Sequence, residues 1–181
     1  MDGRDQGERT VDMGEASKIR DRVMKYMGTP KTTRVLDIGC GNDKIVPWAV
    51  GVDDGSESGN TVAEVRKNAE GDFTLFNLCT PPFDVVFSSH ALEHMKAPIV
   101  ETLRRWILCV KPGGLLILYL PDERKYVYDP MDLNRRNPSH EHYMDSDMFR
   151  WYLDQLDREF HMSVCEHYSF DYSFLVVIKR N

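Results

Sequence analysis

The chain has 181 residues, of which 41% are hydrophobic and 29% charged, and a formal net charge of -6 at pH 7. This length suits one domain, and this composition excludes wholesale disorder. Because apolar runs are too short to span a bilayer and the polar start lacks a secretion signal, we expect a cytoplasmic protein with no membrane partner. The acidic balance argues against a protein that grips nucleic acid through its phosphates.

The beginning of the chain predicts a tail and then an amphipathic helix. Residues 1–15 are polar and without apolar period, so we expect a mobile tail there and a single domain over residues 16–181. From Ala16 to Met27 the apolar residues recur at helical spacing, and a Gly-Thr-Pro sequence ends that helix.

Short β-branched segments then alternate with helical ones. Strands are predicted at residues 34–38, 49–53, 65–71, 83–88 and 115–120, and helices at residues 97–110 and 146–156. The segment around residues 62–69 also fits a helix. This alternation predicts parallel strands joined by crossovers, and therefore a three-layer α/β domain. The final runs, residues 161–168 and 172–179, are so close in sequence that they can only form an antiparallel hairpin.

The most informative segment runs from Val35 to Asn42, where a strand enters a turn with alternating glycines, Gly39 and Gly41. Such a turn lets a ligand lie against bare backbone. Asp53 ends the neighbouring strand, where a carboxylate can accept hydrogen bonds from both hydroxyls of a ribose. The alternatives are a glycine turn that only packs strand on helix and an ordinary loop aspartate.

Further short motifs follow this turn in a fixed order. The series comprises V-L-D-I-G-C-G at 35–41, G-V-D at 51–53, G-D at 71–72, F-D-V-V at 83–86, L-E-H at 92–94 and V-K-P-G-G at 110–114. In this order the motifs resemble the class I S-adenosylmethionine-dependent methyltransferases, especially the small type 11-like members. The resemblance implies a Rossmann-like fold with a mostly parallel seven-stranded sheet and a C-terminal antiparallel hairpin. It also implies methyl transfer from S-adenosylmethionine to an acceptor.

The resemblance further implies a set of cofactor-binding residues. Their implied roles are backbone contact to the methionine part for Gly39, Cys40 and Gly41, water-mediated contact to its ammonium for Asp37, ribose binding for Asp53, adenine binding for Asp72 and Phe73, and contact to the ammonium end for Ser88 and Ser89. The chain departs from the family pattern at Asp43, where a third glycine is common. The segment from Asp37 to Asp53 is also shorter than is usual in the family, so the first crossover helix is expected to be a stub over residues 45–48.

A catalytic base is harder to assign. The sulfonium already activates the methyl group, so the enzyme mainly supplies alignment, and a base matters only if the acceptor loses a proton. Histidine suits that role near neutral pH, and His90, directly after a strand, is the first candidate. The simpler interpretation is that His94 packs at a helix start and that His140 and His142 are solvated.

The long segment from Asp122 to Tyr143 has almost no hydrophobic period and follows the fifth predicted strand at the edge of the cofactor turn. Segments of this length are often functional lids. The residues expected to shape the acceptor pocket are Tyr126, Tyr128, Arg135, Arg136, His140 and Tyr143. A mobile surface loop is the alternative.

Acidic charge and small size favour a small-molecule acceptor over a nucleic acid, while the oligomeric state is not predicted. The four cysteines form no C-x-x-C pair, so no metal site is expected. A nicotinamide-dependent oxidoreductase would share the glycine turn and the ribose carboxylate but not the L-E-H and K-P-G-G motifs. A non-catalytic S-adenosylmethionine-binding partner or sensor domain is the other alternative, because no residue is an unmistakable catalytic group.

Overall fold

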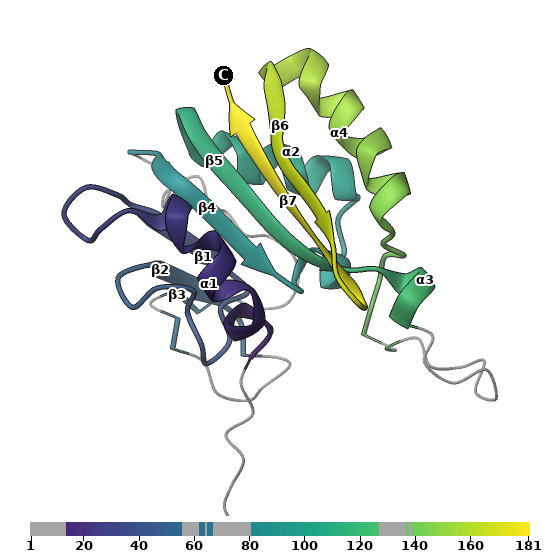
Figure 1. The fold of residues 1–181 in the computed structure, drawn as a ribbon, viewed down its shortest axis with the longest axis horizontal. Helices are drawn as coiled ribbons and strands as arrows, with labels where there is room; N and C mark the ends of the chain where they lie inside the picture. The colour runs from purple at the N-terminus through teal and green to yellow at the C-terminus, as the bar shows by residue number, and fades with distance from the viewer. Residues whose placement is uncertain (1–13, 56–61, 64, 67–80, 127–136, 138) are drawn as a thin grey trace, which may run out of the picture.

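The computed structural model describes residues 14–55, 62–63, 65–66, 81–126, 137 and 139–181. These residues form a seven-stranded sheet with helices on both faces (Figure 1). The strands are β1 (Val35–Ile38), β2 (Val50–Asp53), β3 (Val65–Arg66), β4 (Phe83–Ser89), β5 (Val110–Pro121), β6 (Met162–Ser169) and β7 (Ser173–Arg180). The helices are α1 (Glu15–Met27), the 3-10 helix η2 (Leu92–His94), α2 (Ile99–Leu108), α3 (Glu123–Tyr126) and α4 (Ser146–Phe160).

The strand order is β3-β2-β1-β4-β5-β7-β6. Neighbours from β3 to β5 are parallel, whereas β7 pairs antiparallel with both β5 and β6. The predicted mostly parallel sheet with a closing antiparallel hairpin is therefore confirmed. The chain reverses its direction of strand addition between β1 and β4, and ligands of open α/β sheets bind at the carboxyl ends of strands at such a switch point.

Strand alternation divides the core into two layers. On one face of the sheet, Val23 of α1 belongs to the same buried cluster as Val85 and Phe87 of β4. On the other face, Val86 belongs to a buried cluster with Trp106 of α2 and residues of α4. Because successive strand residues point to opposite faces, one strand supplies both layers. Figure 1 shows α1 in front of the sheet and α2 behind it, which confirms the three-layer arrangement.

Two local predictions were wrong. Residues 45–48 form turns and bends instead of a helical stub. The Ile45 carbonyl, which a helix would use as an acceptor, instead accepts from Arg20 of α1, and Pro47 has no backbone N–H to donate. Strand β5 begins at Val110, before the Lys-Pro-Gly-Gly sequence that was expected to precede it. Its register shifts between the pairs Phe83–Val110 and Val85–Leu115, so those residues form an irregularity within the strand.

Other predictions lie partly outside the described residues. Strand β3 coincides with the start of the strand predicted at 65–71, and the rest of that strand is not described. Most of the predicted tail, residues 1–15, is also outside the description, which begins at Gly14, so the domain boundary stays a prediction. Among the described residues, no helix combines the length and the apolar character needed to cross a membrane.

Candidate functional site

The glycine turn after β1 uses its two glycines differently. Both have positive φ angles, 73° at Gly39 and 50° at Gly41. A Cβ added to Gly39 would lie 2.4 Å from the Cβ of Ala91, so this glycine is required for close packing. A Cβ added to Gly41 would meet no described atom within 4 Å. As far as the described residues show, Gly41 therefore has free space beside its backbone, as a ligand-binding turn requires.

Asp37 lies at the base of this turn and is 1% exposed. Burial raises the pKa of its carboxyl to about 7, although the hydrogen bond from the Ile45 N–H acts in the opposite direction. A carboxyl whose ionised form is disfavoured by burial gains most from a nearby cation. The position is therefore suited to a ligand that carries an ammonium group.

Asp53, at the end of β2, fixes the turn from the other side. Its Oδ2 accepts the backbone N–H of Gly41 at 2.8 Å, and its Oδ1 accepts that of Gly55 at 2.6 Å. Each carboxylate oxygen has a further lone pair, so Asp53 can accept ligand hydroxyls while it holds the backbone. The side chain is only partly buried, which leaves it accessible for that role.

Ser88 and Ser89 end β4, the strand beside β1. Their hydroxyls are buried, and within the described part of the chain neither has a hydrogen-bond partner. An unsatisfied buried hydroxyl costs about 1–3 kcal/mol, so such groups normally have a partner. Since Ser88 is in register with Ile38, next to the glycine turn, a polar ligand seated there could supply that partner.

The departure at Asp43 has a structural role that the sequence did not reveal. Its Oδ1 forms an ion pair with Nη2 of Arg20 at 2.5 Å, and its Oδ2 accepts a hydrogen bond from Ser17. Arg20 also donates to the carbonyls of Lys44 and Ile45. Helix α1 thus holds the short crossover in place.

His90 follows β4 with a positive φ of 48°. Its Nε2 forms a 3.0 Å hydrogen bond with Ser173, and its ring packs against Tyr119. Burial lowers the pKa of His90 to about 4, so the imidazole is neutral at pH 7. Since an effective catalytic base has a pKa near the working pH, this environment does not favour His90 as a base. Its assignment stays a prediction.

His140 and His142 are not solvated as expected. His140 is 8% exposed, and its Nδ1 donates to Oε1 of Glu123 at 2.5 Å. His94 is partly buried, and its Nδ1 donates to the carbonyl of Ser139 at 3.1 Å. His142 is partly buried as well and donates through Nε2 to a backbone carbonyl. The sequence also gave no role to Glu93, which is completely buried between these rings.

The predicted acceptor residues are only partly described. Those outside the described residues are Tyr128, Arg135 and Arg136, together with Asp72 and Phe73 of the predicted adenine site. Tyr126 is the last residue of α3, Tyr143 is exposed, and His140 is buried. The segment also begins differently from the expected loop, since Asp122 is buried and leads directly into α3.

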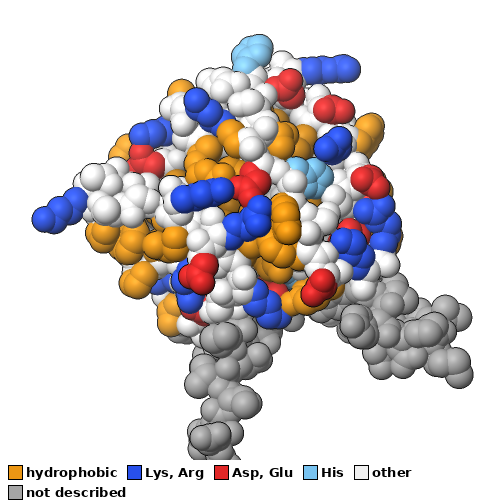
Figure 2. Space-filling model, viewed as in Figure 1, with side chains coloured by type: hydrophobic (Ala, Val, Ile, Leu, Met, Phe, Trp, Pro, Cys, Tyr) orange, Lys and Arg blue, Asp and Glu red, His pale blue; other side chains and the backbone are white. Residues whose placement is uncertain are grey.

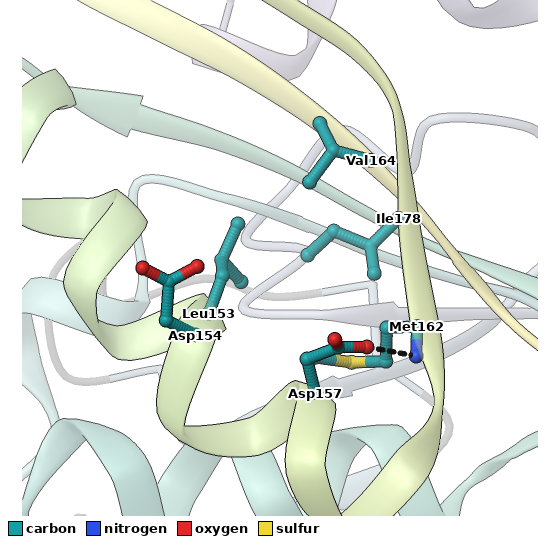
Figure 3. A pocket seen from close by; sticks show the side chains of 6 residues that line it. All are labelled: Leu153, Asp154, Asp157, Met162, Val164 and Ile178. Carbon is teal, nitrogen blue, oxygen red and sulfur yellow. Dashed lines mark hydrogen bonds between the residues drawn. The ribbon is translucent and has the colours of Figure 1, made fainter.

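A separate hollow lies between α4 and β6, at the outer edge of the sheet (Figure 3). Its lining residues are Leu153, Asp154, Asp157, Met162, Val164 and Ile178. The Asp157 side chain forms a hydrogen bond with the backbone here, since its Oδ1 accepts the N–H of Met162 at 2.6 Å. Several strands separate this hollow from β1, so it is distinct from the glycine turn.

Comparison with known proteins decides the family. Residues 11–161 match a family model described as a methyltransferase domain. The chain belongs to the methyltransferase domain family. The predicted S-adenosylmethionine-dependent methyltransferase class and cofactor are thereby confirmed, and the oxidoreductase alternative is set aside. None of the curated proteins compared with this chain matches it.

Solved structures show the same fold at low sequence identity. An S-adenosylmethionine-dependent methyltransferase from Mesorhizobium loti is 14% identical, with a TM-score of 0.64 over 93% of this chain and 99% of that one. One from Archaeoglobus fulgidus is 16% identical, with a TM-score of 0.58 over 92% and 95% of the two chains. The CcbJ methyltransferase from Streptomyces caelestis is 12% identical, with a TM-score of 0.63 over 93% and 90%.

Proposed function

We propose that this methyltransferase acts on a small-molecule acceptor in the cytoplasm, with its cofactor beside the turn from Asp37 to Gly41. The observation that carries the cofactor assignment is the pair of buried hydroxyls on Ser88 and Ser89, which have no partner among the described residues. Ser88 is in register with Ile38, directly before the glycine turn, and a Cβ on Gly41 would meet no described atom within 4 Å. The net charge of -6 favours a small acceptor. So does the face in Figure 2, where Lys and Arg side chains are interspersed with Asp and Glu and form no broad basic patch.

The bound cofactor supplies a methyl group that its sulfonium has activated for in-line attack. The protein then has to bind and align the reactants, which can be worth effective molarities of about 10⁵ to 10⁸ M. In this proposal Asp53 accepts the ribose hydroxyls, Asp37 offsets the ammonium charge, and the serines donate to the polar end of the methionine part. The strands that carry these side chains are hydrogen-bonded neighbours, which keeps the site rigid.

Wild-type protein is expected to bind S-adenosylmethionine and S-adenosylhomocysteine at micromolar concentrations. Calorimetry measures both affinities, and isotope-labelled cofactor incubated with a panel of small acceptors measures transfer. Binding of either cofactor without transfer to any acceptor would favour the non-catalytic sensor or partner. No binding of either at millimolar concentration would contradict the placement of the cofactor site.

Replacing Asp53 with alanine is expected to weaken S-adenosylhomocysteine binding about tenfold, or ~1.4 kcal/mol, because ribose hydroxyls would lose their acceptor. An analogue that lacks the 2′-hydroxyl separates this loss from a disturbed turn. It should bind the wild type more weakly than S-adenosylhomocysteine does, yet bind the variant about as well as the parent compound. Asp54→Ala is the matched control. If Asp54→Ala weakens binding and Asp53→Ala does not, the ribose contact belongs to the neighbouring carboxylate.

A further inference from the structure

Three side chains able to bind a metal converge just beyond the carboxyl end of β4. Glu93 and His94 belong to η2, while His140 comes from a segment far along the chain. One potential ligand atom from each lies within 4.8 Å of the others. The Nε2 atoms of His94 and His140 lie 3.9 and 4.0 Å from the same oxygen, Oε1 of Glu93. Each of these separations is longer than a hydrogen bond.

Both imidazole rings are oriented by their other nitrogen. The Nδ1–H of His140 donates to the Glu123 carboxylate, and the Nδ1–H of His94 donates to the Ser139 carbonyl. In a neutral ring that carries its proton on Nδ1, Nε2 presents a lone pair. Two such lone pairs and a carboxylate oxygen therefore point toward one place. Metal-binding histidines are held in this way, with the second nitrogen donating to a carboxylate or a backbone carbonyl.

The backbone joins the two segments that carry these ligands. The carbonyl of Glu93 accepts the N–H groups of Glu141 and His142 at 2.9 and 3.1 Å. Glu93 is completely buried and His140 is 8% exposed. His94 is partly buried. Two of the three side chains are thus enclosed in the protein, so the cluster differs from a chance meeting of surface side chains.

We propose that Glu93, His94 and His140 bind a divalent transition-metal ion, with Zn²⁺ as the best match. Two imidazoles and one carboxylate suit Zn²⁺ and related ions, whereas Mg²⁺ and Ca²⁺ prefer oxygen ligands. Ligand atoms about 2.0–2.1 Å from a tetrahedral ion lie roughly 3.3 Å apart, so binding would draw each ring about 0.7 Å closer to Glu93. Three protein ligands leave a position for water or for an acceptor atom.

This site adjoins the cofactor turn, since Ala91, two residues before Glu93, packs against Gly39. The cysteine spacing had predicted no metal site, but the ligands here are histidines and a glutamate. His90 lies beside the cluster, with Nδ1 3.5 Å from Oε1 of Glu93. The ion would therefore bind at the edge of the sheet where the acceptor is expected. Metal binding can nevertheless be measured without cofactor or acceptor, so it is tested independently of methyl transfer.

The test titrates untagged, chelator-treated full-length protein with CoCl₂, followed by visible absorption, and with ZnCl₂, followed by calorimetry. We expect one ion per chain, a cobalt spectrum typical of mixed nitrogen and oxygen ligands, and a higher melting temperature with Zn²⁺. His140→Gln should weaken Zn²⁺ binding at least about 100-fold. Glu123→Gln, which removes only the negative charge of the partner that orients His140, should weaken it about 10- to 100-fold. His161→Gln, at an exposed histidine, is the matched control and should bind Zn²⁺ as the wild type does.

Circular dichroism tests whether each variant is folded. If His140→Gln does not fold, Glu123→Gln alone decides the test. The proposal is overturned if the wild type binds neither Co²⁺ nor Zn²⁺ at millimolar concentration. It is also overturned if the folded variants at positions 140 and 123 bind Zn²⁺ as tightly as the wild type, or if His161→Gln loses binding to the same extent.

Discussion

Replacing Gly41 with leucine is expected to weaken S-adenosylhomocysteine binding at least about 100-fold, or ~2.8 kcal/mol, while the protein stays folded. A Cβ at this position would meet no described atom within 4 Å, so the new side chain would extend into the space proposed for the methionine part of the cofactor. Calorimetry with S-adenosylhomocysteine measures the loss, and thermal unfolding measures the accompanying change in stability.

Gly113→Leu is the matched control for this substitution. Gly113 also has a positive φ, 80°, and a Cβ there would likewise meet no described atom within 4 Å. Both variants carry a similar backbone strain of about 1–2 kcal/mol. Gly113 lies near the beginning of β5, at the opposite end from the carboxyl ends of the strands where ligands bind. Gly113→Leu should therefore bind S-adenosylhomocysteine as the wild type does. Equal affinity of the wild type and Gly41→Leu would show that the methionine part lies elsewhere.

The fold could be predicted because its signals are local. Short apolar strands separated by helical periods identify a parallel sheet, and the brief connection before Ser173 permits only a hairpin. The glycine turn was predictable for the same reason. Its backbone has positive φ angles at residues 39 and 41, and glycine is the residue that adopts such angles readily.

The errors arose where distant groups decide the local structure. Arg20 of α1 takes up the carbonyls of Lys44 and Ile45, and these tertiary contacts hold turns where a helical stub was expected. The Lys-Pro-Gly-Gly sequence has the composition of a turn, yet β4 pairs with Val110 before it and with Leu115 after it, so it forms an irregularity within β5.

The Glu93 and His140 cluster was missed because its members meet only after folding, through backbone bonds to the carbonyl of Glu93. The residue types were visible in L-E-H and in the later His-Glu-His sequence at 140–142. Their spacing along the chain gives no sign that they are neighbours. A search for histidines and carboxylates that follow the parallel strands, rather than for cysteine pairs, is the signal that could have joined them.

In the wild type, the buried Asp37 carboxyl is expected to make the free energy of unfolding fall as pH rises, and Asp37→Asn is expected to remove this dependence. Burial raises the pKa of Asp37 from its ordinary value of 3.8 to about 7 in the folded protein. Between these values the folded state keeps a proton that the unfolded state has released, so the wild-type free energy of unfolding receives a contribution that falls as pH rises. The slope is about 1.4 kcal/mol per pH unit, which amounts to about 4 kcal/mol across the window. Asparagine does not titrate and lacks this contribution.

Urea unfolding of the cofactor-free proteins between about pH 4 and pH 8 measures this effect. The stability of Asp37→Asn relative to the wild type should rise with pH up to about 7 and then level off, whereas Asp154→Asn, at an exposed aspartate on α4, should run parallel to the wild type. Parallel curves for Asp37→Asn would mean that the buried carboxyl is ionised throughout. Saturating S-adenosylhomocysteine adds a second condition. If its ammonium lies near Asp37, it lowers the pKa of that carboxyl, and the difference between the wild type and Asp37→Asn should then depend much less on pH.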